Sequence, residues 1–314
     1  MAFLFEKAAV LGATGPAGRH LTRVLDELGT PVRVVARRRE ALAEAAVGTA
    51  AEPWPADLMN EAAAEAALDG VDIAYCCVGA PVAQFDRLVA IAERLAAILQ
   101  RRRNLRLVLV SSYWGYVPIQ RLPVDEAHPR RGGPRPAVLR RRMEDVLRQE
   151  GAAVLNLPDF YGPLVGASSL QRALGQAVQR RRIACIGAPA TERDYVYLPD
   201  AMRVAVRVAA HEAAYGRHWI LAGPGPVSMR RVAAIAAHHL GRSVWPRGAG
   251  RLMLSAMALA DKQLRAFLPM VPTYMGPIAY DDSALHGLIG DIPKTSYVEG
   301  IPRTLDWLAG QAAS

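Results

Sequence analysis

Three glycines near the start of the chain constrain its fold more than any other feature. Gly12, Gly15 and Gly18 are spaced Gly-x-x-Gly-x-x-Gly, directly after the apolar run 7–11 and at the start of an amphipathic stretch over 16–27. In a strand–turn–helix unit, such glycines permit a tight turn, close approach of a ligand and close helix–strand packing. The free N–H groups at the helix N-terminus suit a pyrophosphate. The motif therefore predicts a dinucleotide site, and it contains Gly12, Thr14, Gly15, Pro16, Ala17 and Gly18.

The first 160 residues alternate short apolar runs with helical stretches. Strands are expected at 7–11, 32–36, 73–78, 105–111 and 153–157, with a weak one near 51–55. Helices are expected at 16–27, 39–46, 60–68, 81–102 and 137–149. This alternation predicts a doubly wound, parallel α/β sheet of the Rossmann type.

Proline and glycine become frequent after Gly162, and the strands become short. Helices remain plausible there at 169–180, 200–211 and 228–240. We expect residues 1–162 to form the dinucleotide-binding domain, with the sheet completed by parts of 190–222. Residues 163–314 are then expected to form a smaller substrate-binding region over the carboxyl ends of the strands.

The end of the second strand bears on the choice of nucleotide. Enzymes that use NAD commonly place a carboxylate there, against the adenosine ribose. In this chain the strand is followed by Arg37, Arg38 and Arg39. Guanidinium groups suit the additional 2′-phosphate of NADP, so Arg37 and Arg38 predict a preference for NADP(H) over NAD(H). The alternative is that they are exposed loop arginines in an arginine-rich chain.

Composition and charge exclude several classes of protein. No run approaches the roughly 18 to 20 apolar residues of a membrane span, and no leader is recognisable, so we expect a cytoplasmic protein without a membrane partner. The net charge is +9, but the arginine clusters at 101–103 and 130–142 have no aromatic residues nearby. We expect solvated arginines there and no nucleic-acid partner. Cys76, Cys77 and Cys185 do not form a disulfide framework, and His238 and His239 lack further ligands with metal-site spacing, so no metal is expected.

Seven segments, in order, resemble the short-chain dehydrogenase/reductase superfamily in its extended or atypical branch, the NAD-dependent epimerase/dehydratase family. They are the glycine motif, Asp57-Leu58, Val78-Gly79-Ala80, Ser111-Ser112 with Tyr116, Pro123-x-x-Glu126-x-x-Pro129, Asp159-Phe160-Tyr161-Gly162-Pro163 and the stretch from Arg193 to Asp200. The resemblance implies that Asp57 and Leu58 contact adenine. It implies that Val78, Gly79, Ala80 and Ser111 line the cofactor, and that Ser112 contacts the substrate.

The chain departs from this family at its catalytic Tyr-x-x-x-Lys. Counting from Pro129 places Pro136 at the tyrosine, Arg140 at the lysine and Glu144 at a helix glutamate. No tyrosine in the sequence is followed by a lysine four residues later. The usual proton donor and the lysine that lowers its pKa are therefore both missing.

Two functions agree with this pattern. The first is an NADP(H)-dependent oxidoreductase, or a redox-assisted epimerase, acting on a small organic carbonyl or alcohol. Ser112 would bind the substrate oxygen, Arg140 would supply a fixed positive charge, and Tyr113, Tyr116 or Tyr161 would donate the proton. We favour Tyr116 because its spacing from Ser112 matches the family, although each tyrosine could simply pack at the sheet edge. The second is a non-catalytic NADP(H)-binding sensor, regulator or assembly protein, which the missing Tyr–Lys pair favours.

The substrate is expected to be small and not a nucleotide sugar. Expected contacts are Tyr113, Asp159, Phe160, Arg193 and Tyr274. No row of lysines or arginines accompanies Tyr274, which argues against a sugar-nucleotide diphosphate. A homodimer is compatible with the sequence.

Overall fold

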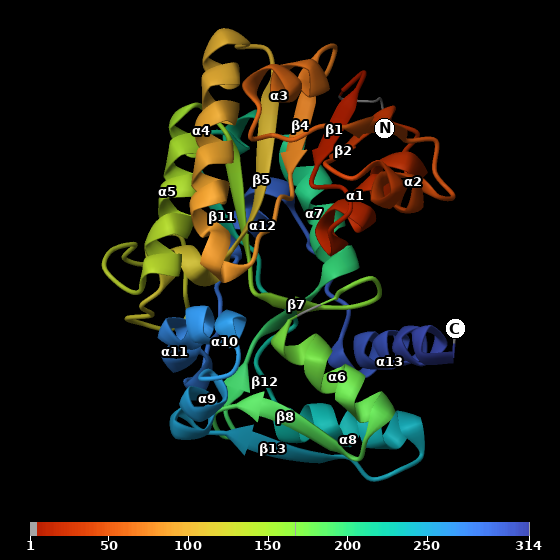
Figure 1. Ribbon diagram of the computed structural model, residues 1–314, viewed down its shortest axis with the longest axis vertical. Helices are drawn as coiled ribbons and strands as arrows, with labels where there is room; N and C mark the ends of the chain where they lie inside the picture. The colour runs from red at the N-terminus through yellow and green to blue at the C-terminus, as the bar shows by residue number, and fades with distance from the viewer. Residues whose placement is uncertain (1–4, 167, 314) are drawn as a thin grey trace.

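The computed structural model describes residues 5–166 and 168–313. Its centre is a seven-stranded sheet in the order β11-β6-β5-β4-β1-β2-β3, in which all neighbouring strands run parallel (Figure 1). The strands are β1 (Ala8–Leu11), β2 (Val32–Ala36), β3 (Glu52–Pro55), β4 (Ile73–Cys76), β5 (Arg106–Ser112), β6 (Ala153–Leu157) and β11 (His218–Ile220). The strand order reverses between β1 and β4, and in open parallel sheets ligands bind outside the carboxyl ends of the strands at such a point. The predicted Rossmann-type sheet is confirmed.

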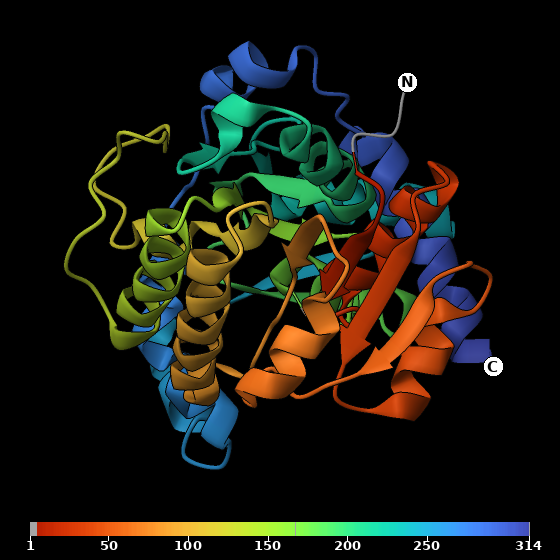
Figure 2. The same ribbon diagram turned by 90° about the horizontal axis from the view of Figure 1, so that it is seen from above.

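Helices cover both faces of this sheet (Figure 2). On one face lie α1 (Pro16–Glu27), α2 (Arg39–Ala46), α7 (Leu198–Ala209) and α12 (Ser283–Ile289). On the other lie α3 (Glu61–Leu68), α4 (Phe85–Arg101) and α5 (Arg135–Gln149). Each face buries its own apolar core, because strands sandwiched between two helical layers expose no face to water.

The rest of the chain forms a smaller region beyond the carboxyl ends of the strands (Figure 1). It contains α6 (Ser169–Gln179), α8 (Met229–Leu240), α9 (Arg251–Met257), α10 (Lys262–Phe267), α11 (Val271–Met275) and α13 (Tyr297–Ala313). Its strands pair in twos: β7 (Asp159–Tyr161) with β10 (Tyr195–Tyr197), β9 (Glu192–Arg193) with β12 (Val227–Ser228), and β8 (Arg182–Ile186) with β13 (Trp245–Ala249). A third apolar core lies between α6, α8 and α13.

The expected elements of the first 160 residues are all present, with small shifts in their ends. The stretch 81–102 begins with a 3-10 turn at Val82–Gln84 before α4, and β5 ends at Ser112. Local sequence explains several helix starts. The side chains of Asn60, Ser168 and Ser228 accept a backbone N–H at the N-termini of α3, α6 and α8. The seventh strand, β11, comes from the range 190–222. Among the described residues, none of the helices has the length and hydropathy of a membrane span.

Candidate cofactor and substrate site

The glycine loop between β1 and α1 is packed so closely that two of its glycines have no room for a side chain. Gly12 has φ +83°, and a Cβ there would lie 2.9 Å from Val78 Cα. A Cβ on Gly18 would lie 2.5 Å from the Gly12 carbonyl oxygen. Gly15 differs, because a Cβ there would meet only that same oxygen, at 3.4 Å. The first and third glycines shape the loop, and the second leaves its outer side open to a ligand.

The N-terminus of α1 offers free donors at this open side. Its N-cap residue, Gly15, makes no side-chain cap, and Pro16 has no N–H. Within the described chain, the N–H groups of Ala17 and Gly18 have no hydrogen-bond partner. Free amides and the helix dipole favour an anion at this place. The loop and helix end therefore fit a dinucleotide pyrophosphate.

The arginines within β2 and directly after it have different roles. Arg33, inside the strand, is buried and donates to Glu52 and to the carbonyls of Ala67 and Asp69. Arg37 and Arg38 are exposed at the carboxyl end, and neither guanidinium group has a hydrogen bond or ion pair with any described residue. No carboxylate stands at the end of this strand. Two guanidinium groups are thus free where the ribose of a bound dinucleotide would lie.

The other predicted cofactor contacts also lie at the carboxyl edge of the sheet. Asp57 and Leu58 follow β3, where the Asp57 carboxylate accepts the Met59 N–H at 3.0 Å and Leu58 is buried. Val78, Gly79 and Ala80 follow β4, and a Cβ on Gly79 would meet no atom within 4 Å. Ser111 is different, because it is buried and donates to Glu144 at 2.5 Å. Its hydroxyl is therefore committed to the protein interior and is not available to a cofactor, which corrects the prediction for Ser111.

Ser112, the last residue of β5, is half-buried, and its hydroxyl makes no hydrogen bond with the described residues. Its carbonyl accepts the Asn156 side-chain amide at 3.2 Å, which fixes the backbone. In the sheet, Ser112 is opposite Leu157 of β6. Asp159 lies two residues after Leu157, the last residue of β6. Ser112 and Asp159 are therefore at the ends of two adjacent strands, at the same edge of the sheet.

The tyrosines expected to donate a proton are not accessible. Tyr116 has no exposed surface, and its ring contacts His128 and His218 edge-on. Tyr161 is also fully buried, between Tyr197 and Tyr297. Neither hydroxyl has a hydrogen-bond partner in the described chain. Burial raises the pKa of both phenols, so neither is poised to ionise. The assignment of Tyr116 or Tyr161 as the acid is wrong in this geometry.

Arg140 occupies the position of the missing lysine, one turn along α5 from Pro136. Its guanidinium stacks over the Phe85 ring with 4.8 Å between the carbon Cζ and the ring centre. Its Nε has no hydrogen-bond partner among the described residues. Burial lowers the pKa of Arg140, and the nearby Glu144 opposes that shift. Arg140 thus brings a fixed, incompletely bonded positive charge close to the end of β4.

Arg193 is buried and already bonded by the protein. Its Nη1 donates to the carbonyls of Thr273 and Gly276 at 2.8 and 2.7 Å, and its Nη2 to the Tyr113 hydroxyl at 3.2 Å. Its guanidinium also lies 4.9 Å from the centre of the Tyr274 ring. Tyr113 and Tyr274 are themselves buried in an aromatic cluster with Trp114, Phe267 and Tyr280. These residues thus have a structural role in place of the predicted substrate contacts. Together, Arg193, Tyr113 and Tyr274 hold α11 against the rest of the protein.

Asp159 is the acidic group at this edge. One of its oxygens, Oδ2, accepts the backbone N–H of Ser169 at 3.0 Å and also the Ser169 hydroxyl. The residue is half-buried, as is the neighbouring Phe160. Burial raises the pKa of Asp159, although the bonds from Ser169 and the charge of Arg193 oppose this. A carboxyl group of raised pKa therefore follows the strand next to that of Ser112, whose hydroxyl is free.

A buried ionic network behind Ser111 was not predicted. Glu144 has no exposed surface and accepts hydrogen bonds from Ser111, from Arg130 at 2.5 Å and from Asn156 at 2.9 Å. Arg130 also donates to Asp145 at 2.7 Å. Arg141 is buried too, and donates to the carbonyl of Val117 at 2.7 Å. The expectation that the cluster 130–142 is solvated is thus wrong for Arg130 and Arg141. A buried arginine needs hydrogen-bond acceptors. Here the acceptors are groups whose pairing with Arg130 and Arg141 cannot be read from the sequence.

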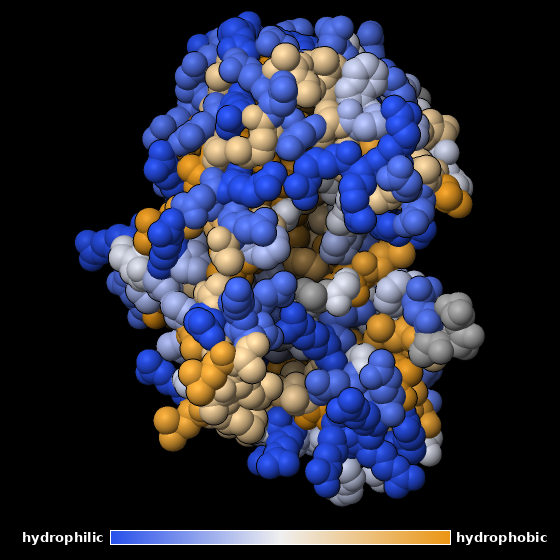
Figure 3. Space-filling model, viewed as in Figure 1, coloured by the Kyte–Doolittle hydropathy of each residue, from blue (hydrophilic) through white to orange (hydrophobic). Residues whose placement is uncertain are grey.

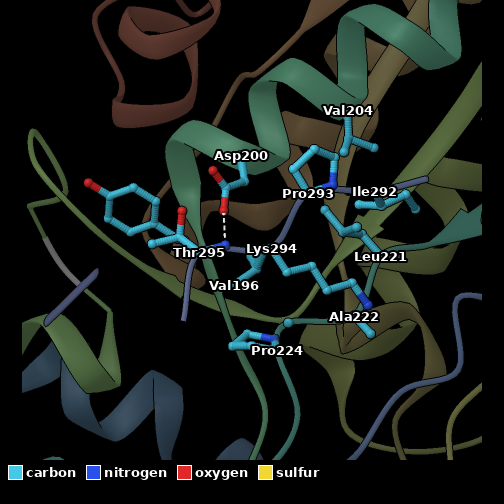
Figure 4. A pocket seen from close by; sticks show the side chains of 12 residues that line it. Val196, Asp200, Val204, Leu221, Ala222, Pro224, Ile292, Pro293, Lys294 and Thr295 are labelled. Atoms are coloured by element: carbon cyan, nitrogen blue, oxygen red, sulfur yellow. Dashed lines mark hydrogen bonds between the residues drawn. The ribbon is translucent and has the colours of Figure 1, made fainter. Parts of the chain in front are cut away.

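Two hollows lie away from the glycine loop. The first is a crevice between α7 and the segment 292–295, where Asp200 accepts the Thr295 N–H at 2.7 Å and Lys294 runs past Pro224 (Figure 4). The second, of about 360 Å³, is lined by Pro123, the loop 222–226, Asp281 and Lys294. Lys294 lines both and pairs with Asp282 at 2.8 Å. Neither is lined by the glycine loop, Arg37 or Ser112. Figure 3 shows a separate hollow between the sheet and the smaller region, with apolar colour at its floor.

No group of three or more histidine, cysteine or acidic residues suited to a metal ion occurs in the part of the chain that the structure describes. His239 instead lies 2.6 Å from Asp306, and all three cysteines are free.

Comparison with known proteins agrees with the fold. Residues 12–153 match a family model described as NAD(P)H-binding. Similar solved structures include UDP-glucose 4-epimerase from Bifidobacterium longum in complex with NAD+ and UDP, with 17% identity, a TM-score of 0.80, and 98% of this chain and 99% of that chain covered. Another is UDP-glucuronic acid 4-epimerase from Bacillus cereus in complex with NAD, with 14% identity, a TM-score of 0.79, and 98% and 100% covered. A third is dTDP-glucose 4,6-dehydratase from Bacillus anthracis in complex with NAD, with 12% identity, a TM-score of 0.81, and 98% and 97% covered. No curated protein matches the sequence.

Proposed function

We propose that this chain, which belongs to the NAD(P)H-binding Rossmann proteins and has the fold of the extended short-chain dehydrogenases/reductases, is a cytoplasmic NADP(H)-dependent oxidoreductase or redox-assisted epimerase. Its substrate is a small organic carbonyl or alcohol. The observation that carries the proposal is the open glycine loop at the N-terminus of α1, together with the free Arg37 and Arg38 at the end of the neighbouring strand.

A bound nicotinamide supplies or accepts a hydride, and the protein supplies position and a proton. Ser112 binds the substrate oxygen through its free hydroxyl. Asp159 holds the proton that this oxygen gains or loses, because burial keeps its carboxyl group protonated to a higher pH than usual. Arg140 remains charged and orients groups beside β4, and it does not exchange protons.

The substrate in this proposal is uncharged and largely apolar. Arg193, the buried cation beside Asp159, donates to two carbonyls and a hydroxyl, and its Nε has no partner among the described residues. A diphosphate there would be a second anion near the buried Asp159, which costs free energy. The aromatic cluster around Tyr274 instead supports an apolar wall.

Replacing Arg37 with aspartate tests the cofactor preference. We expect the variant to bind NADP(H) about 10- to 150-fold more weakly, which corresponds to about 1.5–3 kcal/mol for one charged hydrogen bond. NAD(H) affinity should change much less, since it lacks the 2′-phosphate. Titration calorimetry with each nucleotide measures both. Arg23→Asp is the matched control, because Arg23 is an equally exposed arginine on α1. Equal affinity of the wild-type protein for NADP(H) and NAD(H) would refute the preference.

Turnover is tested by following NADPH oxidation with a panel of ketones, enones and imines, with UDP-glucose as the nucleotide-sugar comparison. We expect activity with an apolar carbonyl compound and none with UDP-glucose. Ser112→Ala should lower kcat/KM about 10- to 150-fold, as for the loss of one hydrogen bond to a developing charge. NADPH affinity should stay the same, since Ser112 lies outside the phosphate loop. Full activity of the alanine variant would remove Ser112 from the site.

A second candidate is a non-catalytic NADP(H)-binding sensor or assembly protein. It is favoured by the replacement of the Tyr–Lys pair with Pro136 and Arg140 and by the burial of Tyr116 and Tyr161. Tight NADPH binding without turnover of any compound in the panel would favour this candidate.

A further inference from the structure

The most exposed apolar side chains of the smaller region gather on α9 and the turn that follows it. Leu252 is 88% exposed, Leu259 79% and Met257 55%, and Met253 is also exposed. Figure 3 shows the apolar colour of this area at the lower left, where Figure 1 places α9 and α10. We call Leu252, Met253, Met257 and Leu259 the α9 patch. Single exposed apolar residues are ordinary, but four within eight positions mark a contact surface.

Buried residues and side-chain hydrogen bonds support the α9 patch on its inner side. Leu254 and Ala258 are buried on the inner side of α9, where Leu254 packs with Ala249 and Val271. Arg265 of α10 donates to the carbonyls of Ala258 and Leu259 at 3.1 and 2.7 Å, which closes the C-terminal end of α9. The α9 patch is therefore presented on an ordered support.

The surroundings of the α9 patch are basic. The side chains of Arg247, Arg251 and Lys262 are exposed, and none of these side chains makes a hydrogen bond or ion pair with any described residue. The sequence contains no aspartate or glutamate between Glu212 and Asp261. The one acidic residue within the stretch 247–262 is Asp261, whose Oδ1 caps α10 by accepting the N–H groups of Gln263 and Leu264. An apolar centre with a basic rim results.

We propose that the α9 patch docks the protein on the surface of an anionic membrane. An apolar face flanked by lysine and arginine enters the interface between headgroups and acyl chains, while its cations meet the acidic lipids. A second copy of the chain fits less well, because a two-fold contact through this surface would place Arg247, Arg251 and Lys262 near their own copies. This proposal departs from the expectation of no membrane partner, which rested on the lack of a spanning segment and does not bear on peripheral contact.

Docking through this patch would bring the candidate site close to the lipid surface. Helix α10 contacts the 3-10 turn Val82–Gln84, which follows the loop Val78–Ala80 at the end of β4. Phe267 at the end of α10 contacts Trp114 and Tyr274 of the aromatic cluster.

Co-sedimentation with lipid vesicles tests the proposal. We expect the full-length protein to bind vesicles containing about 30% phosphatidylglycerol at least tenfold more tightly than pure phosphatidylcholine vesicles. Raising the salt from about 0.05 to 0.5 M should weaken binding, because it screens the basic rim. Leu252→Ser/Leu259→Ser should weaken binding at both salt concentrations, and Arg251→Glu/Lys262→Glu chiefly at the lower one.

Leu28→Ser/Val47→Ser is the matched control for the apolar change, since both residues are exposed hydrophobics of the Rossmann domain. It should bind vesicles like the wild type. Circular dichroism and NADPH affinity confirm that each variant is folded. The proposal is overturned if phosphatidylglycerol gives no gain, or if the Leu252/Leu259 variant binds like the control. It is also overturned if light scattering shows a dimer that only the Leu252/Leu259 variant loses.

Discussion

Replacing Glu144 with alanine is expected to lower the free energy of unfolding by about 3–5 kcal/mol, as for a buried ion pair that loses one partner. Glu144 is fully buried and accepts hydrogen bonds from Ser111, Arg130 and Asn156. The alanine leaves the buried donors of Ser111 and Asn156, and the half-buried Arg130, without this acceptor. Arg130 retains its bond to Asp145, which limits the loss. Urea unfolding followed by circular dichroism measures the change.

Glu93→Ala is the matched control, because it also removes a glutamate paired with an arginine of α5. The Glu93–Arg142 pair has 2.7 Å between its atoms, but both side chains are exposed. Such a pair contributes about 0–1 kcal/mol. The loss of unfolding free energy for Glu144→Gln should lie between the losses for Glu144→Ala and Glu93→Ala. An amide still offers an oxygen acceptor but no charge to Arg130. A loss below about 1 kcal/mol for Glu144→Ala would show that the network does not stabilise the fold.

The glycine loop and the parallel sheet were predictable because their signals are local. A strand, a glycine turn and a helix follow one another within residues 8–27, and the observed steric limits at Gly12 and Gly18 agree with the motif. The partners of Glu144 were not predictable in the same way. Glu144 lies on the helix α5 and Asn156 on the strand β6, and only the tertiary fold brings them together.

The tyrosine after Ser112 shows why spacing along the chain did not identify the acid. The residues Tyr113–Tyr116 form a 3-10 turn directly after β5. Tyr113 packs against Tyr274 and Tyr280, whereas Tyr116 packs against His128 and His218. Both are buried there, with 2% and 0% of their surface exposed. Tyr116 comes shortly after the end of β5, but the direction of its side chain depends on a turn that the motif does not specify.

We propose Asp159 as the acid because it follows the strand next to that of Ser112, and its replacement should have the largest effect on turnover. We expect Asp159→Asn to lower kcat by about 100-fold or more, as for the loss of a general acid, with little change in NADPH affinity. The amide preserves the shape and can still accept the hydrogen bonds of Ser169. It cannot donate a proton to a substrate oxygen.

The pH dependence distinguishes proton donation by Asp159 from a purely structural role. A general acid works only while protonated, so carbonyl reduction should slow as the pH rises through the pKa of Asp159. Because burial raises this pKa, the decline should begin above the usual range of an aspartate, and Asp159→Asn should abolish it. Asp281→Asn is the matched control, since Asp281 also accepts the N–H and hydroxyl of a serine, Ser283, but those bonds lower its pKa. If Asp159→Asn keeps the wild-type pH profile, or if Asp281→Asn shifts it equally, the proton comes from another group.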